Sequence, residues 1–470
     1  MNKKVEVLES VTSASIGSTS STLRRAWLIT GLLVVFQMIN FADKAVLGLV
    51  AESAMAELGM TSTEFGFIGS SFFFLFAISG VVVGFIAGKI QTKWIILVMG
   101  VSWAILQFPM LFGGGAMALL ITRIILGAAE GPASSISLQH VQGWYEPTSR
   151  GFPSSLVASG TTIGPIIAAP VLAYIIAHPD YGWRWAFGFL GIAGLVWSIA
   201  WFLVFKEGPY SHVSDDPTQK KQSDQSVKPF DSHKSIAAHV DDLKPVPIVK
   251  IFTSKMFIVA VFAGIGCFWP LGFLTTWAPK YIGTVAQLSP QMIGTVSTLP
   301  WIFGALALLF AGFISRVLMK KGATVHQALG VNFGIIILIS GICFSFIPFS
   351  TGSGSIALIT LAAGAAMTFP LATMTVGFSV CSQQRAAVMA TLVSLSSIGG
   401  IISPLMVGAL MDGAGYVQPP KGTLLSPEMA QHLITGMNQG FHYIGFYLMI
   451  VSILTILFLN PDRTAQQHQV

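Results

Sequence analysis

Four formally charged side chains lie inside long apolar segments of this sequence: Asp43, Lys44, Arg123 and Glu130. An isolated charge at the centre of a lipid bilayer costs about 2.5–3.5 kcal/mol even on a lenient insertion scale, so four unpaired charges would cost roughly 10–14 kcal/mol. We therefore expect these groups to face a protein interior and to compensate one another or a ligand. The two cations could hold an anion, and a buried carboxylate could carry a proton.

The spacing of these charges predicts which of them meet. Arg123 and Glu130 are seven residues apart, so on a helix they share one face, about 10 Å apart along the axis. If the first segment runs outward and the fourth runs inward, Asp43, Lys44 and Arg123 lie at a similar depth and Glu130 lies deeper. We predict that Asp43 pairs with Arg123 and that Lys44 stays available for a ligand. The alternative is a structural ion-pair cluster that locks the two helices together.

Neutral polar residues complete the set of candidate ligand contacts. Gln37 and Asn40 share a helix face with Lys44 and form a polar stripe in an otherwise apolar segment. The apolar segments of the second half would contribute neutral groups to the site, and the candidate ligand contacts among them are Trp277, Thr373 and Ser397. Other hydroxyl groups there, Thr275 and Thr276 among them, are weaker candidates because most Ser and Thr residues in membrane helices bond their own helix or a neighbour. His140 could shuttle protons, and a packed structural histidine is the alternative.

The composition requires a membrane to surround these segments. Only 9% of the 470 residues are Asp, Glu, Lys or Arg, against roughly 25% in soluble globular proteins. Hydrophobic residues make up 53% of the chain and the mean hydropathy is +0.74. These values exclude an ordinary soluble enzyme, a disordered chain and a nucleic-acid-binding protein. The three cysteines have no CxxC spacing, so we expect neither a metal site nor any other cofactor.

Apolar runs along the chain are long enough to cross a bilayer as helices, which takes about 20 residues each. They are continuous, whereas the strands of a membrane barrel alternate in polarity over about ten residues. The runs lie at 26–50, 64–87, 94–113, 116–142, 152–177, 183–205, 254–281, 289–317, 324–348, 354–381, 386–411 and 437–459. The sequence therefore predicts an all-α membrane protein with twelve transmembrane helices.

The runs fall into two groups of six, separated by a polar segment. We predict a flexible tail (1–24), an N-terminal six-helix half (25–205), a central loop (206–253), a C-terminal six-helix half (254–460) and a second tail (461–470). The halves echo each other, since GFIAGK at the end of the second run resembles GFISR at the end of the eighth. Two parallel six-helix repeats are typical of a secondary transporter whose site lies between the halves. A Walker A motif is absent from the sequence, which argues against an ATP-driven pump.

Basic residues predict the orientation. With the N-terminus inside, only Arg184, Lys280 and Lys421 of the loop cations lie outside, as the positive-inside rule requires. Both termini are then cytoplasmic. The first residues lack the continuous apolar core of a secretory signal peptide.

Two motifs resemble those of the major facilitator superfamily and, more narrowly, of its anion:cation symporter family. Residues 40–44, NFADK, resemble the family's Asn-x-x-Asp-Arg in helix 1, and residues 123–132, RIILGAAEGP, resemble its helix-4 signature Arg-x-x-x-Gly-x-x-Glu. Residues 208–214, GPYSHVS, are similar to the segment after helix 6. The resemblance covers about residues 25–460, and the family includes proton-coupled transporters of sugar acids such as galactonate and hexuronate.

The resemblance implies a proton-coupled symporter of a small organic anion, a carboxylate or sugar acid, that works by alternating access as a monomer in the bacterial inner membrane. Its partners would be the anion, protons and the lipid bilayer. By resemblance, Asp43 and Glu130 take part in proton coupling, and Lys44 and Arg123 act in anion binding and gating.

The sequence also departs from the family's pattern. Lys44 replaces the usual Arg, Phe41 stands where sugar-acid members often have Tyr, and Ser397 stands where many members have Asn. These changes weaken the case for a polyhydroxylated substrate and leave aromatic or small carboxylates open. A proton-coupled exporter of drugs or metabolites and a non-transporting membrane sensor are the alternative functions.

Overall fold

A computed structural model describes residues 3–86, 90–146, 149–211, 246–423, 425–461 and 464, and the described part contains helices and no strand. In the first half, the helices are α1 (Lys3–Leu58), α2 (Ser62–Ile86), α3 (Thr92–Leu111), α4 (Ala116–Glu130), α5 (Ala133–Gln142), α6 (Gly151–Ala177) and α7 (Trp183–Val204). In the second, they are α10 (Ile248–Phe252), α11 (Lys255–Thr276), α12 (Ala278–Ala286), α13 (Pro290–Val296), α14 (Leu299–Lys320), the π-helix η1 (His326–Val331), α15 (Asn332–Phe346), the 3-10 helix η2 (Ile347–Phe349), α16 (Ser353–Ala366), α17 (Pro370–Gly377), α18 (Ser382–Ser396), α19 (Ile398–Gly413) and α20 (Pro427–Phe458).

Twelve helical stretches of the described part are long and apolar enough to cross a membrane, and each overlaps one of the predicted runs. The prediction of twelve membrane helices is therefore confirmed. The largest shift of a single boundary is in the last span, which begins at Pro427 and not near residue 437. The first turns of this helix are polar, so hydropathy does not mark them. The helix is nevertheless well capped, because the Ser426 hydroxyl accepts a hydrogen bond from the Met429 amide (3.2 Å) and Pro427 occupies the first turn.

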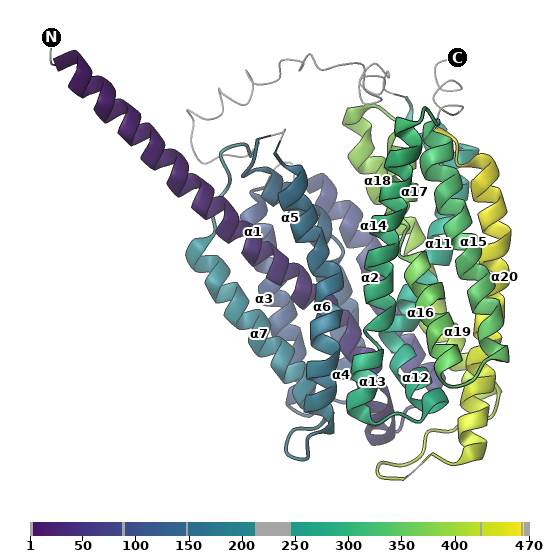
Figure 1. Cartoon of the computed structure of the whole chain (residues 1–470). Coiled ribbons are helices and arrows are strands. Elements are labelled where there is room, and N and C mark those ends of the chain that lie inside the picture. The colour runs from purple at the N-terminus through teal and green to yellow at the C-terminus, as the bar shows by residue number, and fades with distance from the viewer. Residues whose placement is uncertain are drawn as a thin grey trace.

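The helices gather into two bundles that follow the order of the chain (Figure 1). In the first bundle α1 packs against α6 and α7, α3 against α7, and α2 against α4. In the second, α15 packs against α16 and α20, and α11 against α19 and α20. The bundles meet where α2 contacts α18 and α19, where α6 contacts α13 and α14, and where α1 contacts α11 and α12. The second helix of each half thus packs against the fifth helix of the other, as two related repeats would.

The division of the chain into tails, halves and a central loop remains a prediction. Residues 212–245, most of the predicted loop, lie outside the described residues, as do 462–463 and 465–470 of the predicted C-terminal tail. The family-like segment 208–214 is therefore described only to residue 211. Helix α1 begins at Lys3, so most of the segment predicted as a flexible tail is helical in the structure.

Contacts between the halves concentrate at the end of the bundle remote from both chain termini, where α12 and α13 lie (Figure 1). We call this the distal end. There the Asp412 carboxylate of α19 accepts hydrogen bonds from the Ser62 amide (3.1 Å), the Thr63 amide (2.8 Å) and the Thr63 hydroxyl (2.5 Å). The first amides of α2 have no partner within their own helix, so this N-terminal cap comes from the opposite half. At the other end, α5 and α17 pack mainly within their own halves.

Gly127 in α4 and Gly131, which directly follows this helix, bring this segment into backbone contact with α2. A Cβ atom at Gly127 would overlap the carbonyl oxygen of Phe72, and a Cβ atom at Gly131 would overlap that of Phe76. The two helices can approach this closely only because these positions lack a side chain. The glycines of the helix-4 motif therefore hold the face that carries Arg123 and Glu130 in a defined place.

Candidate functional site

Lys44 and Glu130 form a buried ion pair between α1 and α4. The Lys44 ammonium contacts Glu130 Oε2 and donates to the Asn40 side-chain oxygen (2.8 Å) and the Asn40 carbonyl (3.3 Å). It also lies 4.4 Å from the centroid of the Phe41 ring. Lys44 and Glu130 are only 6% and 1% exposed. Lys44 is therefore not the available cation that the sequence predicts, since its three donors all have acceptors.

The predicted pairing of Asp43 with Arg123 is wrong for their side chains. Arg123 Nη1 donates to the main-chain oxygen of Asp43 (3.0 Å), while Arg123 Nη2 and both Asp43 carboxylate oxygens have no hydrogen-bond partner. Their similar depth in the membrane correctly predicts that Asp43 and Arg123 are neighbours, but it does not specify which way each side chain points around its helix. Consecutive helical residues point about 100° apart, so Lys44 reaches Glu130 with its side chain while Asp43 meets Arg123 through its main-chain oxygen.

Asp43 instead lies next to Gln107 of α3, which sequence reasoning did not select. Both residues are buried, and neither Gln107 Nε2 nor the Asp43 carboxylate makes a hydrogen bond of good geometry. The signal was present in the sequence, because Gln107 is a polar residue inside the apolar run 94–113. It carries no formal charge, so the spacing of charges does not identify it.

The predicted polar stripe of α1 is buried and only partly satisfied. Gln37 donates through Nε2 to the Ser134 hydroxyl of α5 (3.1 Å), but its oxygen has no partner. Asn40 Nδ2 and Glu130 Oε1 also lack partners. Buried polar atoms are normally satisfied by protein or by water, so this cluster has unused hydrogen-bonding capacity for a polar ligand, for water or for both.

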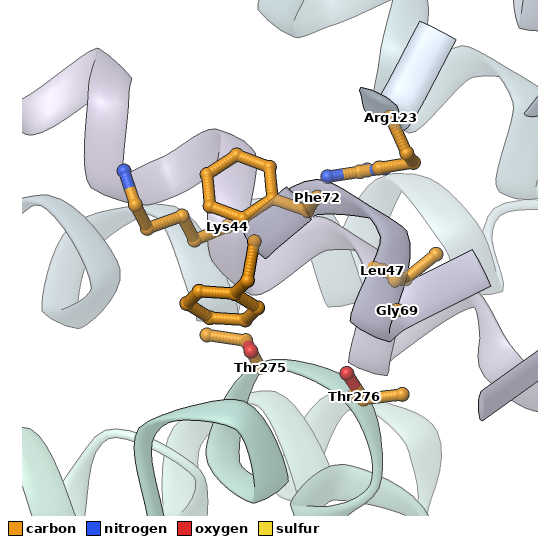
Figure 2. Close-up of a pocket in the computed structure, with 8 residues that line it drawn as sticks. Lys44, Leu47, Gly69, Phe72, Arg123, Thr275 and Thr276 are labelled. Atoms are coloured by element: carbon orange, nitrogen blue, oxygen red, sulfur yellow. The ribbon is translucent and has the colours of Figure 1, made fainter. Parts of the chain in front are cut away.

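A pocket lies between the halves beside these charges. Its lining comes from α1, α2, α4 and α11: Lys44, Leu47, Gly69, Phe72, Phe73, Arg123, Thr275 and Thr276. Figure 2 shows Lys44 and Arg123 on either side of Phe72, with Thr275 and Thr276 approaching from α11. Thr276 Oγ1 has no partner, whereas Thr275 Oγ1 donates to the Leu271 carbonyl of its own helix (3.0 Å). The pocket therefore combines two cations, aromatic walls and one free hydroxyl group.

Three predicted ligand contacts of the second half do not line this pocket. Trp277 is fully buried and donates through Nε1 to the Pro404 carbonyl (2.9 Å). Thr373 and Ser397 donate to the carbonyls of Pro370 (2.8 Å) and Ser394 (2.7 Å) in their own chain segments. Their roles as ligand contacts stay predictions.

His140 lies at the far end of α5 from Glu130 and is packed in a local network. Its Nδ1 is 2.8 Å from the Thr92 hydroxyl, and its Nε2 accepts from the Trp144 indole (3.4 Å). The Glu207 carboxylate joins this network, 3.7 Å from His140 Nδ1, and also accepts from the Lys93 amide at the start of α3 (2.9 Å). This environment matches the alternative of a packed structural histidine.

Residues 33–404 match the family described as the Major Facilitator Superfamily. The chain belongs to this superfamily. It is 26% identical to a hexuronate transporter of Bacillus subtilis over 386 residues, which cover 80% of this chain and 86% of that protein. It is 23% identical over 412 residues to a D-galactonate transporter of Escherichia coli O6:H1, covering 84% of this chain and 91% of that protein. These relatives are anion:cation symporter-type members of the superfamily, as the two motifs indicate.

Solved structures show the same fold. The crystal structure of a bacterial homologue of the human lysosomal transporter Spinster, inward-facing and unoccupied, superposes with a TM-score of 0.74 at 17% identity, covering 94% of this chain and 98% of that one. A D-xylose–proton symporter superposes with a TM-score of 0.68 at 15% identity, covering 92% and 97%. The family and its curated relatives identify the protein as a membrane transporter and not an enzyme. The predicted multi-pass location in a bacterial inner membrane agrees with this family and with its bacterial relatives.

Proposed function

We propose that the protein takes up a small organic anion, a carboxylate or sugar acid, together with protons, by alternating access of the pocket between the halves. Relatives named as hexuronate and galactonate transporters support this substrate class. With the N-terminus inside, only three of the loop cations would lie outside the cell, which supports a cytoplasmic location for both termini. The distal end would then face the outside of the cell.

The observation that carries the proposal is the buried ion pair of Lys44 and Glu130 beside the pocket. Lys44 and Arg123 both line the pocket, Lys44 is held by Glu130, and Arg123 Nη2 has no partner. An incoming carboxylate binds Arg123 Nη2 and draws Lys44 away from Glu130. The Glu130 carboxylate is then buried without a counter-charge, a state that is much less costly when the group takes up a proton. Anion binding and proton binding thereby favour each other.

Asp43 supplies a second proton site in the proposal. Its carboxylate is 1% exposed, and neither oxygen receives a hydrogen bond. A carboxylate in such surroundings is far more stable as the neutral acid than as the anion. We infer that Asp43 carries a proton in this conformation and releases it when the pocket opens to water on the other side.

The test is a pH-change assay in proteoliposomes that contain the purified protein. Monocarboxylates, sugar acids, aromatic acids and cationic drugs are added one at a time, and proton movement is followed with an internal pH dye. The proposal expects inward proton movement with one or more carboxylates and none with the cationic drugs. Proton movement out of the vesicles on addition of a cationic drug would instead identify an exporter, and no response to any carboxylate would contradict the proposal.

A further inference from the structure

Lys280 is a buried cation that the proposed mechanism does not use. It belongs to α12 at the distal end and is 8% exposed. Its ammonium contacts the side-chain oxygen of Gln418 and lies 4.9 Å from the centroid of the Tyr416 ring. Both partners are uncharged groups of the segment that follows α19. A buried ammonium held only by neutral groups is costly, so its retention here calls for a counter-charge.

The position of Lys280 aligns it with the pocket. Lys280 follows Thr276 by four residues, and two hydrogen bonds bridge the junction between α11 and α12: the Trp277 amide donates to the Phe273 carbonyl (2.8 Å) and the Tyr281 amide to the Trp277 carbonyl (3.0 Å). Residues four apart on a helix lie on the same face. Lys280 is therefore about one helical turn distal of Thr276, which lines the pocket.

The facing helix α1 carries the matching carboxylate. A Cβ atom at Gly48 would lie 3.0 Å from both Pro279 Cδ and the Thr275 carbonyl oxygen, so α1 and α12 are in direct contact at this level. Glu52 is one turn further along α1 and is exposed. Burial lowers the pKa of Lys280 and the charge of Glu52 raises it from a distance, and the two side chains form no ion pair in this structure. Glu52 belongs to the first half and Lys280 to the second. Separation of the halves at the distal end would take this charge away from Lys280.

We propose that Lys280 is a second anion-binding site, which takes a carboxylate group of the substrate when the distal end is open and lies in the field of the nearby Glu52 carboxylate when it is closed. The substrate would then meet Lys280 first and pass one helical turn inward to Arg123 and Lys44. Closure would bring Glu52 toward Lys280, where it competes with the bound anion and favours its transfer to the pocket. This inference rests on the proposed function, since it requires an anionic substrate.

The test compares KM values from the two faces of the membrane. Right-side-out and inside-out vesicles are used, with D-galacturonate and D-galactonate as probes. Because a charged hydrogen bond to the anion is lost, Lys280→Gln should raise KM from the distal face roughly tenfold or more and leave KM from the other face unchanged. Lys280→Arg should keep KM near the wild-type value from both faces. Lys421→Gln, which removes an exposed cation from the same end of the protein, is the matched charge control.

Glu52→Gln provides a second test that does not depend on a buried position. Removal of the competing carboxylate should lower KM from the distal face by about two- to fivefold, the effect of an exposed ion pair. An unchanged distal KM in either variant, or equal changes from both faces in Lys280→Gln, would overturn the role of Lys280. Wild-type vesicles that show no proton-driven uptake of either probe would exclude these sugar acids as substrates and overturn the inference for them, whereas normal uptake with an unaffected Lys280→Gln variant overturns the inference alone.

Discussion

The ion pair between Lys44 and Glu130 is buried on both sides, so removing one partner leaves the other charge uncompensated. We expect Lys44→Ala and Glu130→Ala each to destabilise the protein by roughly 3–5 kcal/mol, and the double variant to recover much of this loss. Thermal unfolding of the detergent-solubilised protein measures the cycle. Additive losses in the double variant would mean that the pair does not form in solution.

Glu130→Gln separates proton coupling from anion binding. Glutamine keeps an oxygen that can accept from Lys44 but cannot exchange a proton, so we expect loss of proton-driven accumulation with retained substrate exchange between preloaded vesicles. Lys44→Arg, which preserves the positive charge, serves as the comparison and should retain coupled uptake. Normal accumulation by Glu130→Gln under an imposed proton gradient would remove Glu130 from the coupling role.

For single residues, the sequence predicted which charged side chains belong to the site better than it predicted which of them form ion pairs. Asp43, Lys44, Arg123 and Glu130 are recognisable because charges are rare in apolar runs, and the structure buries all four in one region. Which carboxylate meets which cation depends on helix rotation and packing, which the spacing of residues along one helix does not specify. The aromatic lining from Phe72 and Phe73 gave no signal, because both belong to a run of apolar residues like any other.

Among the elements, the contact between α2 and α4 depends on glycine. Gly127→Ala places a Cβ atom on the Phe72 carbonyl oxygen, and we expect the resulting overpacking to lower stability by roughly 1–3 kcal/mol and to reduce transport. Gly312→Ala is the control, because nothing lies within 4 Å of its Cβ position on α14. Thermal unfolding of both variants tests this, and equal melting temperatures would show that α4 can move aside without cost.

The cap of α2 by Asp412 predicts a different kind of defect, because it links the two halves. Asp412→Ala should favour separation of the distal ends, which would lengthen the distance between spin labels at Phe67→Cys and Gly413→Cys, after replacement of the three native cysteines by alanine. Glu64→Ala is the matched control, since Glu64 accepts from the Thr61 amide (2.9 Å) at the same helix start but within one half. Identical distance distributions in Asp412→Ala and the parent protein would show that the cap does not hold the halves together.

For the whole molecule, the pH of the distal compartment should control anion affinity through Lys280. Burial lowers the pKa of Lys280 to about 8, against the opposing effect of the Glu52 carboxylate. Below this pH the side chain is a cation, and above it the charge is lost, so KM from the distal face should rise between pH 7 and pH 9. Exchange at equal pH on both sides removes the proton gradient from the measurement. Lys280→Arg should flatten the profile, and an identical rise in that variant would assign it to another group.

The twelve-helix fold could be predicted almost completely, because each span must satisfy its own backbone in lipid and therefore appears as a long apolar run. The ends of the spans were less predictable, as the polar first turns of α20 show. The conformational state could not be predicted, since the contacts that close the distal end, such as Ser62 and Thr63 with Asp412, join residues about 350 positions apart in the chain. No local pattern in the sequence reports such a contact.

All four ionisable residues of the central site come from α1 and α4, within the first half of the chain, whereas α11 of the second half contributes only hydroxyl groups to the pocket. The two halves could therefore evolve under separate selection. A chimera that joins residues 1–205 of this protein to the second half of a relative would take its proton-coupling residues from this protein. Part of its substrate contacts would come from the relative. Gene fusion or recombination near the midpoint of the chain would then be a short route to new nutrients that leaves the driving ion unchanged.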